Sequence, residues 1–67
     1  MSRVRILVYN LAGQLIRVLF DGEQSPGRYA VAWDGTSANG NRVVSGVYLV
    51  RMETEHFGAV RMIMLIN

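Results

Sequence analysis

The sequence predicts a small all-β protein, an antiparallel β-sandwich of about five short strands. Three observations lead to this fold class. Several segments alternate large apolar side chains with small or polar ones, at the two-residue period of a strand. No segment keeps a helical period, and clusters of glycine, asparagine and proline separate the alternating segments. Because 67 residues are enough for one domain only, we treat residues 1–67 as a single module.

The first two predicted strands form a hairpin. Residues 4–10 are apolar on one side, and residues 14–20 are largely apolar on both sides. Residues 10–13 lie between them and contain asparagine and glycine, which tight turns favour. A helix over residues 11–20 is the competing interpretation. The short length and the β-branched residues favour extended structure instead.

A connection and a third strand follow. Residues 21–27 contain two glycines and the only proline of the chain, which predicts a connection. Residues 29–33 predict a strand, because the large side chains of Tyr29, Val31 and Trp33 alternate with alanines. The alanine side of this strand is small enough to lie close to another backbone.

The second half of the chain predicts a loop and a closing hairpin. Residues 34–42 are polar and contain Asn39-Gly40, a strong turn signal, so we expect a surface loop. Residues 47–54 and 57–66 are the last two predicted strands, with a short turn at Glu55-His56. The final half of the last strand is apolar on both sides.

The composition indicates a module that needs support from another chain or domain. A chain of 67 residues buries only roughly 60% of its unfolded surface, which leaves its stability marginal. Without a cysteine, no disulfide or thiolate metal site can supplement the core. Since 51% of the residues are hydrophobic, the chain has more apolar surface to bury than a domain of this size buries easily.

The charges and apolar runs argue against two classes of partner. All seven basic residues are arginines spread singly along the chain, and the net charge is only +2, so we predict no nucleic-acid binding. The longest apolar run, residues 62–66, is far shorter than the ~20 residues of a membrane-spanning helix, so we predict no membrane insertion. The N-terminus has no long apolar segment typical of a signal peptide.

Short motifs along nearly the whole chain carry a family resemblance. They are residues 8–13 (Val-Tyr-Asn-Leu-Ala-Gly), 16–19 (Ile-Arg-Val-Leu), 27–29 (Gly-Arg-Tyr), 33–35 (Trp-Asp-Gly), 39–40 (Asn-Gly), 44–48 (Val-Ser-Gly-Val-Tyr) and 61–65 (Arg-Met-Ile-Met-Leu). Together they resemble the FlgD Ig-like domain, the type found at the C-terminal end of the flagellar hook-capping protein and of many secreted bacterial proteins. The pattern is also similar to the C-terminal sorting domains of the type IX secretion system.

The resemblance implies an Ig-like β-sandwich without catalytic activity or a cofactor, with a role in attachment, assembly or export. It also implies an extracellular or cell-surface location. Members usually carry one or two further strands upstream, so we expect a sandwich without its N-terminal strands and a chain that is a fragment of a larger secreted protein. The Trp-Asp-Gly element at residues 33–35 places the sequence nearer to the hook-capping proteins than to the sorting domains.

The aromatic residues Trp33, Tyr29 and Tyr48 have two interpretations. Flat rings can stack on sugar faces, which would make the chain a carbohydrate-binding accessory module. The alternative is packing in the core, where a tyrosine ring is buried while its hydroxyl bonds to backbone. We favour packing because Trp33 alternates in phase with Val31.

The polar residues predict no catalytic, metal or cofactor site. The loop that starts at Asp34 has a glycine six residues on, close to the glycine of a calcium loop, but Ser45 stands where the bidentate carboxylate is required. Asp34 is better explained as a residue that bonds to its own turn. His56 is the only histidine, beside Glu55 in a turn, and a catalytic dyad would need an oriented nucleophile.

Two sets of apolar residues follow from the alternation. The predicted core is Ile6, Val18, Val31, Trp33, Tyr48, Val50 and Met62. The set predicted to lie on the outer sides of the strands, and to form an interface, is Leu7, Leu15, Leu19, Ile63 and Leu65. Leaving several such side chains in water is unfavourable, so we expect a homo-oligomer or a neighbouring domain to cover them. The predicted function is therefore a non-enzymatic module for protein–protein attachment or self-association, with carbohydrate binding and a secretion or sorting signal as alternatives.

Overall fold

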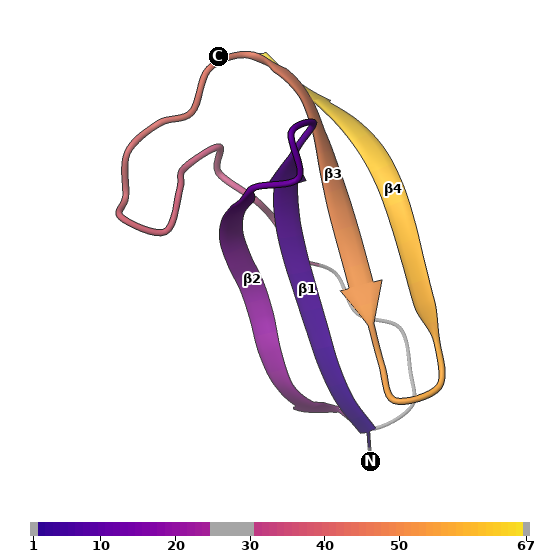
Figure 1. Ribbon diagram of the computed structural model, residues 1–67. Helices are drawn as coiled ribbons and strands as arrows, with labels where there is room; N and C mark the ends of the chain where they lie inside the picture. Colours follow the sequence, from indigo (N-terminus) through magenta and orange to yellow (C-terminus); the bar gives the residue numbers. More distant parts are fainter. Residues whose placement is uncertain (1, 25–30, 67) are drawn as a thin grey trace.

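The computed structural model describes residues 2–24 and 31–66, and these residues contain one antiparallel β-sheet (Figure 1). The sheet has the order β2-β1-β3-β4. Its strands are β1 (Ser2–Asn10), β2 (Leu15–Gln24), β3 (Gly46–Glu53) and β4 (Gly58–Leu65). The all-β antiparallel class is confirmed, with four strands in a single layer over the described ranges. None of the described residues forms a helix that is long and apolar enough to cross a membrane.

The turn between β1 and β2 forms where the sequence predicts it. The side-chain oxygen of Asn10 accepts hydrogen bonds from the backbone N–H groups of Ala12 (3.0 Å) and Gln14 (2.9 Å). Gly13 has a φ of 84°, in the left-handed region that favours glycine. Asparagine therefore supplies the acceptor and glycine the backbone angle that close this hairpin.

Strand β2 is longer and less regular than the alternation predicts. It continues to Gln24, through residues expected to form a connection. Its pairing with β1 shifts register twice, between Ile6 and Leu7 and between Val8 and Tyr9. Each shift inserts an extra residue and reverses the alternation of side chains.

The first register shift explains one wrong core prediction. Ile6 pairs with Phe20, but after the shift Val18 pairs with Leu7 and therefore lies on the opposite face from Ile6. Val18 is 41% exposed.

The predicted third strand is not a strand where the structure describes it. Tyr29 and Ala30 lie outside the described residues, and residues 31–33 have no ladder pairing. The chain instead runs from β2 to β3 by an irregular connection over residues 31–45. Val31 is 43% exposed, so its assignment to the core is wrong, because without a ladder the alternation does not fix which way its side chain points.

The β3–β4 hairpin corrects the predicted faces of the last strand. Glu53 pairs with Gly58 and the connection has an even number of residues, so even-numbered positions of β3 lie opposite odd-numbered positions of β4. Tyr48 is therefore opposite Ile63, and Leu49 is opposite Met62. Met62 was assigned to the core, but it lies on the other face from Tyr48 and is 72% exposed. Ile63 and Leu65, predicted for the outer side, lie on the face of Tyr48 and are partly buried.

The fully buried side chains belong to the centre of the sheet. Leu7 and Val8 on β1 are 0% exposed, and Tyr48 on β3 is 5% exposed. Leu7 was predicted to be an interface residue, which is wrong. It lies between its partners Val18 and Arg51 on the two neighbouring strands, where flanking side chains exclude water from a central strand.

We predict that Leu7→Ala lowers the free energy of unfolding by about 2–5 kcal/mol, because it removes a fully buried side chain from the centre of the sheet. Urea unfolding followed by Trp33 fluorescence measures this change. Val44→Ala is the matched control, since Val44 is 79% exposed and its truncation should change stability by less than about 0.5 kcal/mol. Equal stabilities of the two variants would contradict the central position of Leu7.

Candidate interaction surface

One face of the sheet is covered by the connection between β2 and β3, and we call it the covered face. The ring of Trp33, from the connection, meets the ring of Tyr48 edge to face, with centroids 5.2 Å apart and an interplanar angle of 69°. The Trp33 indole N–H donates to the carbonyl of Thr36 at 2.8 Å. The Tyr48 hydroxyl donates to the carbonyl of Val44 at 2.6 Å, four residues upstream, like the tyrosine corner of Ig-like sandwiches.

Arg17 holds the connection against β2. It lies opposite Val8, on the covered face, and its guanidinium donates to the hydroxyl of Thr36 and, at 3.4 Å, to the carbonyl of Ser37. The backbone N–H of Ala38 donates to the carbonyl of Ile16 at 3.0 Å, at the edge of β2. These contacts join the tip of the connection to the sheet by both side-chain and backbone bonds.

Asp34 bonds to its own turn, as the sequence predicts. Its carboxylate accepts from the hydroxyl of Thr36 at 2.5 Å and from the backbone N–H of Thr36 at 3.1 Å. These two bonds, with a smaller contribution from the Arg17 guanidinium 3.7 Å away, hold the pKa of Asp34 below its ordinary value. Asp34 therefore stays ionised and organises the start of the polar loop.

A hollow lies beside Trp33, between β2 and the connection. It is lined by Arg17, Val18, Leu19, Ala32, Trp33 and Asp34. Leu19, predicted for the interface, is partly buried here as an extra residue of the first register shift. The charged groups of the hollow, Arg17 and Asp34, already pair with each other, so the hollow presents no free acid–base pair.

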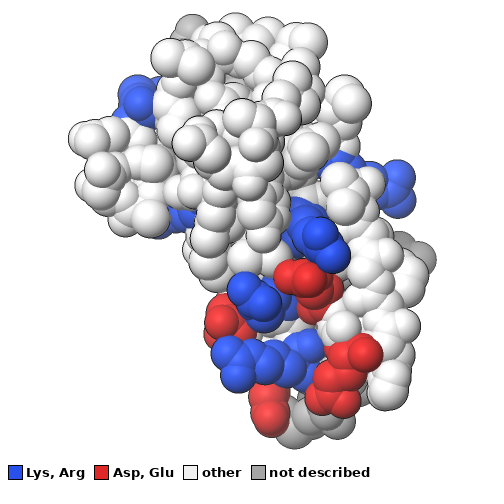
Figure 2. All heavy atoms as spheres, viewed as in Figure 1, with Lys and Arg blue, Asp and Glu red and all other residues white. Residues whose placement is uncertain are grey.

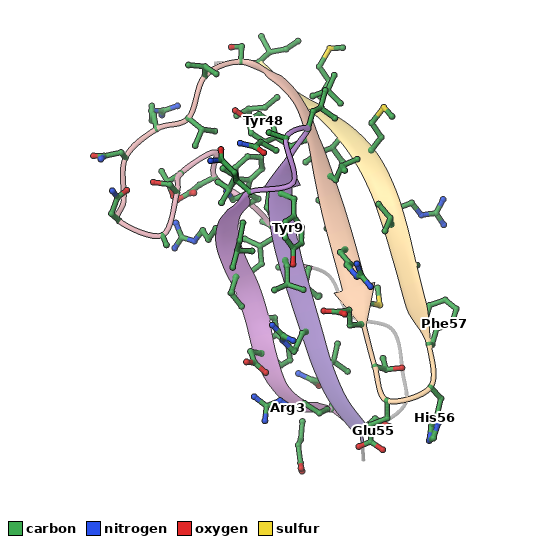
Figure 3. All side chains as sticks on the ribbon, viewed as in Figure 1. Arg3, Tyr9, Tyr48, Glu55, His56 and Phe57 are labelled. Atoms are coloured by element: carbon green, nitrogen blue, oxygen red, sulfur yellow. The ribbon has the colours of Figure 1, made fainter. Side chains whose placement is uncertain are left out.

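The residues considered for sugar binding or catalysis do not form a site in the part of the chain that the structure describes. Tyr48 is too buried for its ring to stack on a sugar, and Tyr29 lies outside the described residues. His56 is at the tip of the β3–β4 hairpin beside Glu55, with 90% of its side chain exposed (Figure 3). Within residues 2–24 and 31–66 no group of three or more histidine, cysteine, aspartate or glutamate residues could hold a metal ion.

The opposite face of the sheet carries no described segment over it, and we call it the open face. The pairing register places Leu15, Val18, Val60, Met62 and Met64 on this face, and we call this set the apolar patch. Met62 and Met64 are 72% and 71% exposed, and each of the other three is more than 40% exposed. Figure 2 shows that uncharged side chains cover the end of the molecule that lies away from the N-terminus. Exposed apolar residues normally occur singly on a protein surface, whereas these five share one face of the sheet.

Charged residues gather at the other end of the open face, near the N-terminus (Figure 2). Arg3 pairs with Asp21 at 2.9 Å, and Glu53 pairs with Arg51 at 3.3 Å and with Arg5 at 3.7 Å. These side chains are substantially exposed, so each pair contributes little to stability. Arg3, Arg5, Asp21 and Glu53 give the face a polar border with both signs of charge, whereas Arg51 lies between Leu7 and Val60, within the row of the patch.

The structure selects different interface candidates from those of the sequence. Of the predicted set, Leu15 alone lies in the apolar patch, where it is 51% exposed. The patch residues that the predictions missed are Val18, Val60, Met62 and Met64. The even length of the β3–β4 connection could have placed the two methionines correctly, since it fixes which positions face each other across the hairpin.

Comparison with known proteins gives one match. The family model described as the FlgD Ig-like domain matches residues 1–57, which include β1, β2 and β3. Strand β4 lies beyond the matched residues. No curated protein and no solved structure matches the chain.

We predict that Thr36→Val raises the pKa of Asp34 toward its ordinary value, because it removes the hydroxyl that donates to the carboxylate. A lowered pKa stabilises the fold above the unfolded-state pKa of about 3.9, and this stabilisation is lost as the pH falls through the folded-state pKa. The stability difference between wild type and Thr36→Val should therefore be larger at neutral pH than in acid.

Nuclear magnetic resonance titration of the Asp34 carboxyl group, with urea unfolding across the same pH range, measures both effects. Ser37→Ala is the control, because Asp34 accepts from Thr36 and not from Ser37. An unchanged Asp34 pKa in Thr36→Val, with a stability difference independent of pH, would refute this role of the hydroxyl.

Proposed function

Because the chain belongs to the FlgD Ig-like domain family, we propose that it is a non-catalytic assembly module that self-associates through the open face of its sheet. Domains of this family are structural modules without catalytic activity. The observation that carries the proposal is the apolar patch. Covering a side chain of this kind is worth about 1.5–3 kcal/mol relative to full exposure, so a chain that covers several together gains substantial binding energy.

The exposed area supports a partner on this face. The chain exposes 5030 Å², whereas a compact monomer of 7.5 kDa exposes about 4,200 Å². The excess, about 800 Å², equals the area that one partner contributes to an interface of standard size. The Cα radius of gyration is 12.3 Å, above the about 11 Å of a compact domain of this length, as expected for a sheet with one face open.

A second copy fits the open face by shape and charge. Two sheets that pack face to face form the layers of a β-sandwich, with their strands within about 30° of each other. Such a contact places one apolar patch against the other. The charged end carries residues of both signs and can lie outside the contact, in water. Self-association would thus supply the second layer that the described residues do not contain.

The family also supports a location for this role. The flagellar hook-capping protein is a hook component exported to the cell exterior, and we place this module outside the cell or at its surface. Attachment through an apolar face suits that setting, because assembly then needs neither a cofactor nor a chemical step.

We predict that wild type sediments as an oligomer and that Leu15→Lys gives a smaller species. A lysine in the patch would bring a charge into the contact and remove a buried leucine, which should raise the dissociation constant at least about tenfold. Analytical ultracentrifugation at several concentrations measures the change. Val44→Lys is the control, since Val44 is 79% exposed on the connection and outside the patch.

Circular dichroism should show that both lysine variants remain folded. The proposal is wrong if wild type is a monomer up to about 100 μM, a concentration at which even weak dimers form. It is also wrong if Leu15→Lys associates as wild type does.

A further inference from the structure

The two edge strands of the sheet differ in how they are protected against pairing with another chain. On β2, two register shifts bend the edge, Asp21 and Glu23 add charge, and Ala38 bonds to the carbonyl of Ile16. Bulges, charges and a covering segment are the devices by which natural sheets block their edges. This edge is therefore poorly suited to accept a further strand.

Strand β4 has almost none of these devices. It pairs with β3 without a register shift from Gly58 to Leu65, and no other described strand lies beside it. Arg61 is its one charged residue, and it contains no proline. A regular, apolar edge with a single charge is a template for another strand.

The hairpin shows which backbone groups of β4 point away from β3. The N–H of Thr54 donates to the carbonyl of Phe57 at 2.7 Å, so these two residues form a hydrogen-bonded pair. Such pairs alternate with non-hydrogen-bonded pairs along an antiparallel ladder. The backbone groups of Arg61 and Ile63 therefore face β3, and those of Met62 and Met64 face outward.

We propose that β4 pairs antiparallel with β4 of a second copy, about a two-fold axis at Ile63, so that two sheets join into one. This inference deepens the proposed self-association by naming a second contact of the same module. In this register the outward backbone groups of Met62 meet those of Met64 in the second copy. The apolar patches of the two copies then meet across the new seam and form one wider apolar surface.

Charge disfavours one alternative register. An axis at Arg61 would place two arginines directly opposite each other, which is destabilising. With the axis at Ile63, Arg61 lies opposite Leu65 of the second copy, and the arginines are four residues apart along the strands, roughly 13 Å.

The identity of the partner follows from the difference between the two edges. Pairing of β4 with β2 of a second copy would meet the bulges and charges of β2, and as a head-to-tail contact it would not close with two copies. Pairing of β4 with β4 uses one unprotected edge from each copy and closes on itself.

Met64→Pro tests the edge contact. Proline removes an N–H that points away from β3, so the β3–β4 ladder keeps its bonds while the pairing with a second copy loses one. Met64→Ala is the control, because it shortens the same side chain and keeps the N–H. With face and edge contacts both present we expect wild type to be a tetramer, and Met64→Pro and Leu15→Lys each to be dimers.

The variants separate this inference from the proposed function. If Met64→Pro keeps the wild-type oligomer and Leu15→Lys does not, the edge contact is wrong and the face contact stands. If Leu15→Lys keeps the wild-type oligomer and Met64→Pro does not, the edge contact stands and the proposed face contact is wrong. If the variant that combines Leu15→Lys with Met64→Pro is also an oligomer of wild-type size, the face contact and the edge contact are both wrong.

A cross-link tests the register. The chain has no cysteine, so Ile63→Cys introduces a single thiol, which the two-fold axis would place beside its copy within the about 4.5–5.5 Å of a directly opposed pair. We expect mild oxidation to give a covalent dimer that still unfolds cooperatively. Leu65→Cys lies on the face of Ile63, away from the apolar patch, and would face Arg61 of the second copy, so it should give none. Cross-linking of Leu65→Cys in place of Ile63→Cys would overturn the proposed register.

Discussion

The fold depends on how the connection between β2 and β3 is held against the sheet. Trp33 packs on Tyr48, and Arg17 binds the far end of the connection through Thr36 and Ser37. These contacts bury the ring of Tyr48 and leave its hydroxyl bonded to the backbone of the same connection. A sheet has two faces, however, and one connection of this length covers one of them. No described segment covers the other face.

This one-sided cover explains why the fully buried core is so small. Leu7, Val8 and Tyr48 are the buried apolar residues of the described ranges, and they lie at the centre of the sheet, where neighbouring strands help to cover them. Strand β4 is at the edge and has a neighbouring strand on one side only, and its Met62 and Met64 are largely exposed. For a family of structural modules, an incompletely covered sheet is consistent with assembly, because association then supplies part of the burial that folding alone does not.

The local features of the fold could be predicted from the sequence, and the faces of the strands could not. Asn10 and Gly13 identify the first turn, and Asp34 its own turn, because these residues act through bonds to their nearest neighbours. The two register shifts in β2 depend on its pairing with β1, and no residue type marks them. Because of the first shift, Val18 lies on the opposite face from Ile6 and not on the same face as predicted. The face of Met62 could be predicted from the sequence, because the length of the β3–β4 connection fixes which residues of β3 and β4 lie opposite each other.

The central claim is that the open side of this sheet, including the edge of β4, is covered by a second copy. Amide hydrogen exchange at low and high protein concentration tests it most directly. The N–H groups of Met62 and Met64 point outward, whereas those of Arg61 and Ile63 bond to β3. We expect the outward pair to exchange rapidly in dilute protein and to become protected at high concentration, with the inward pair protected in both. Rapid exchange of Met62 and Met64 at every concentration would contradict the account.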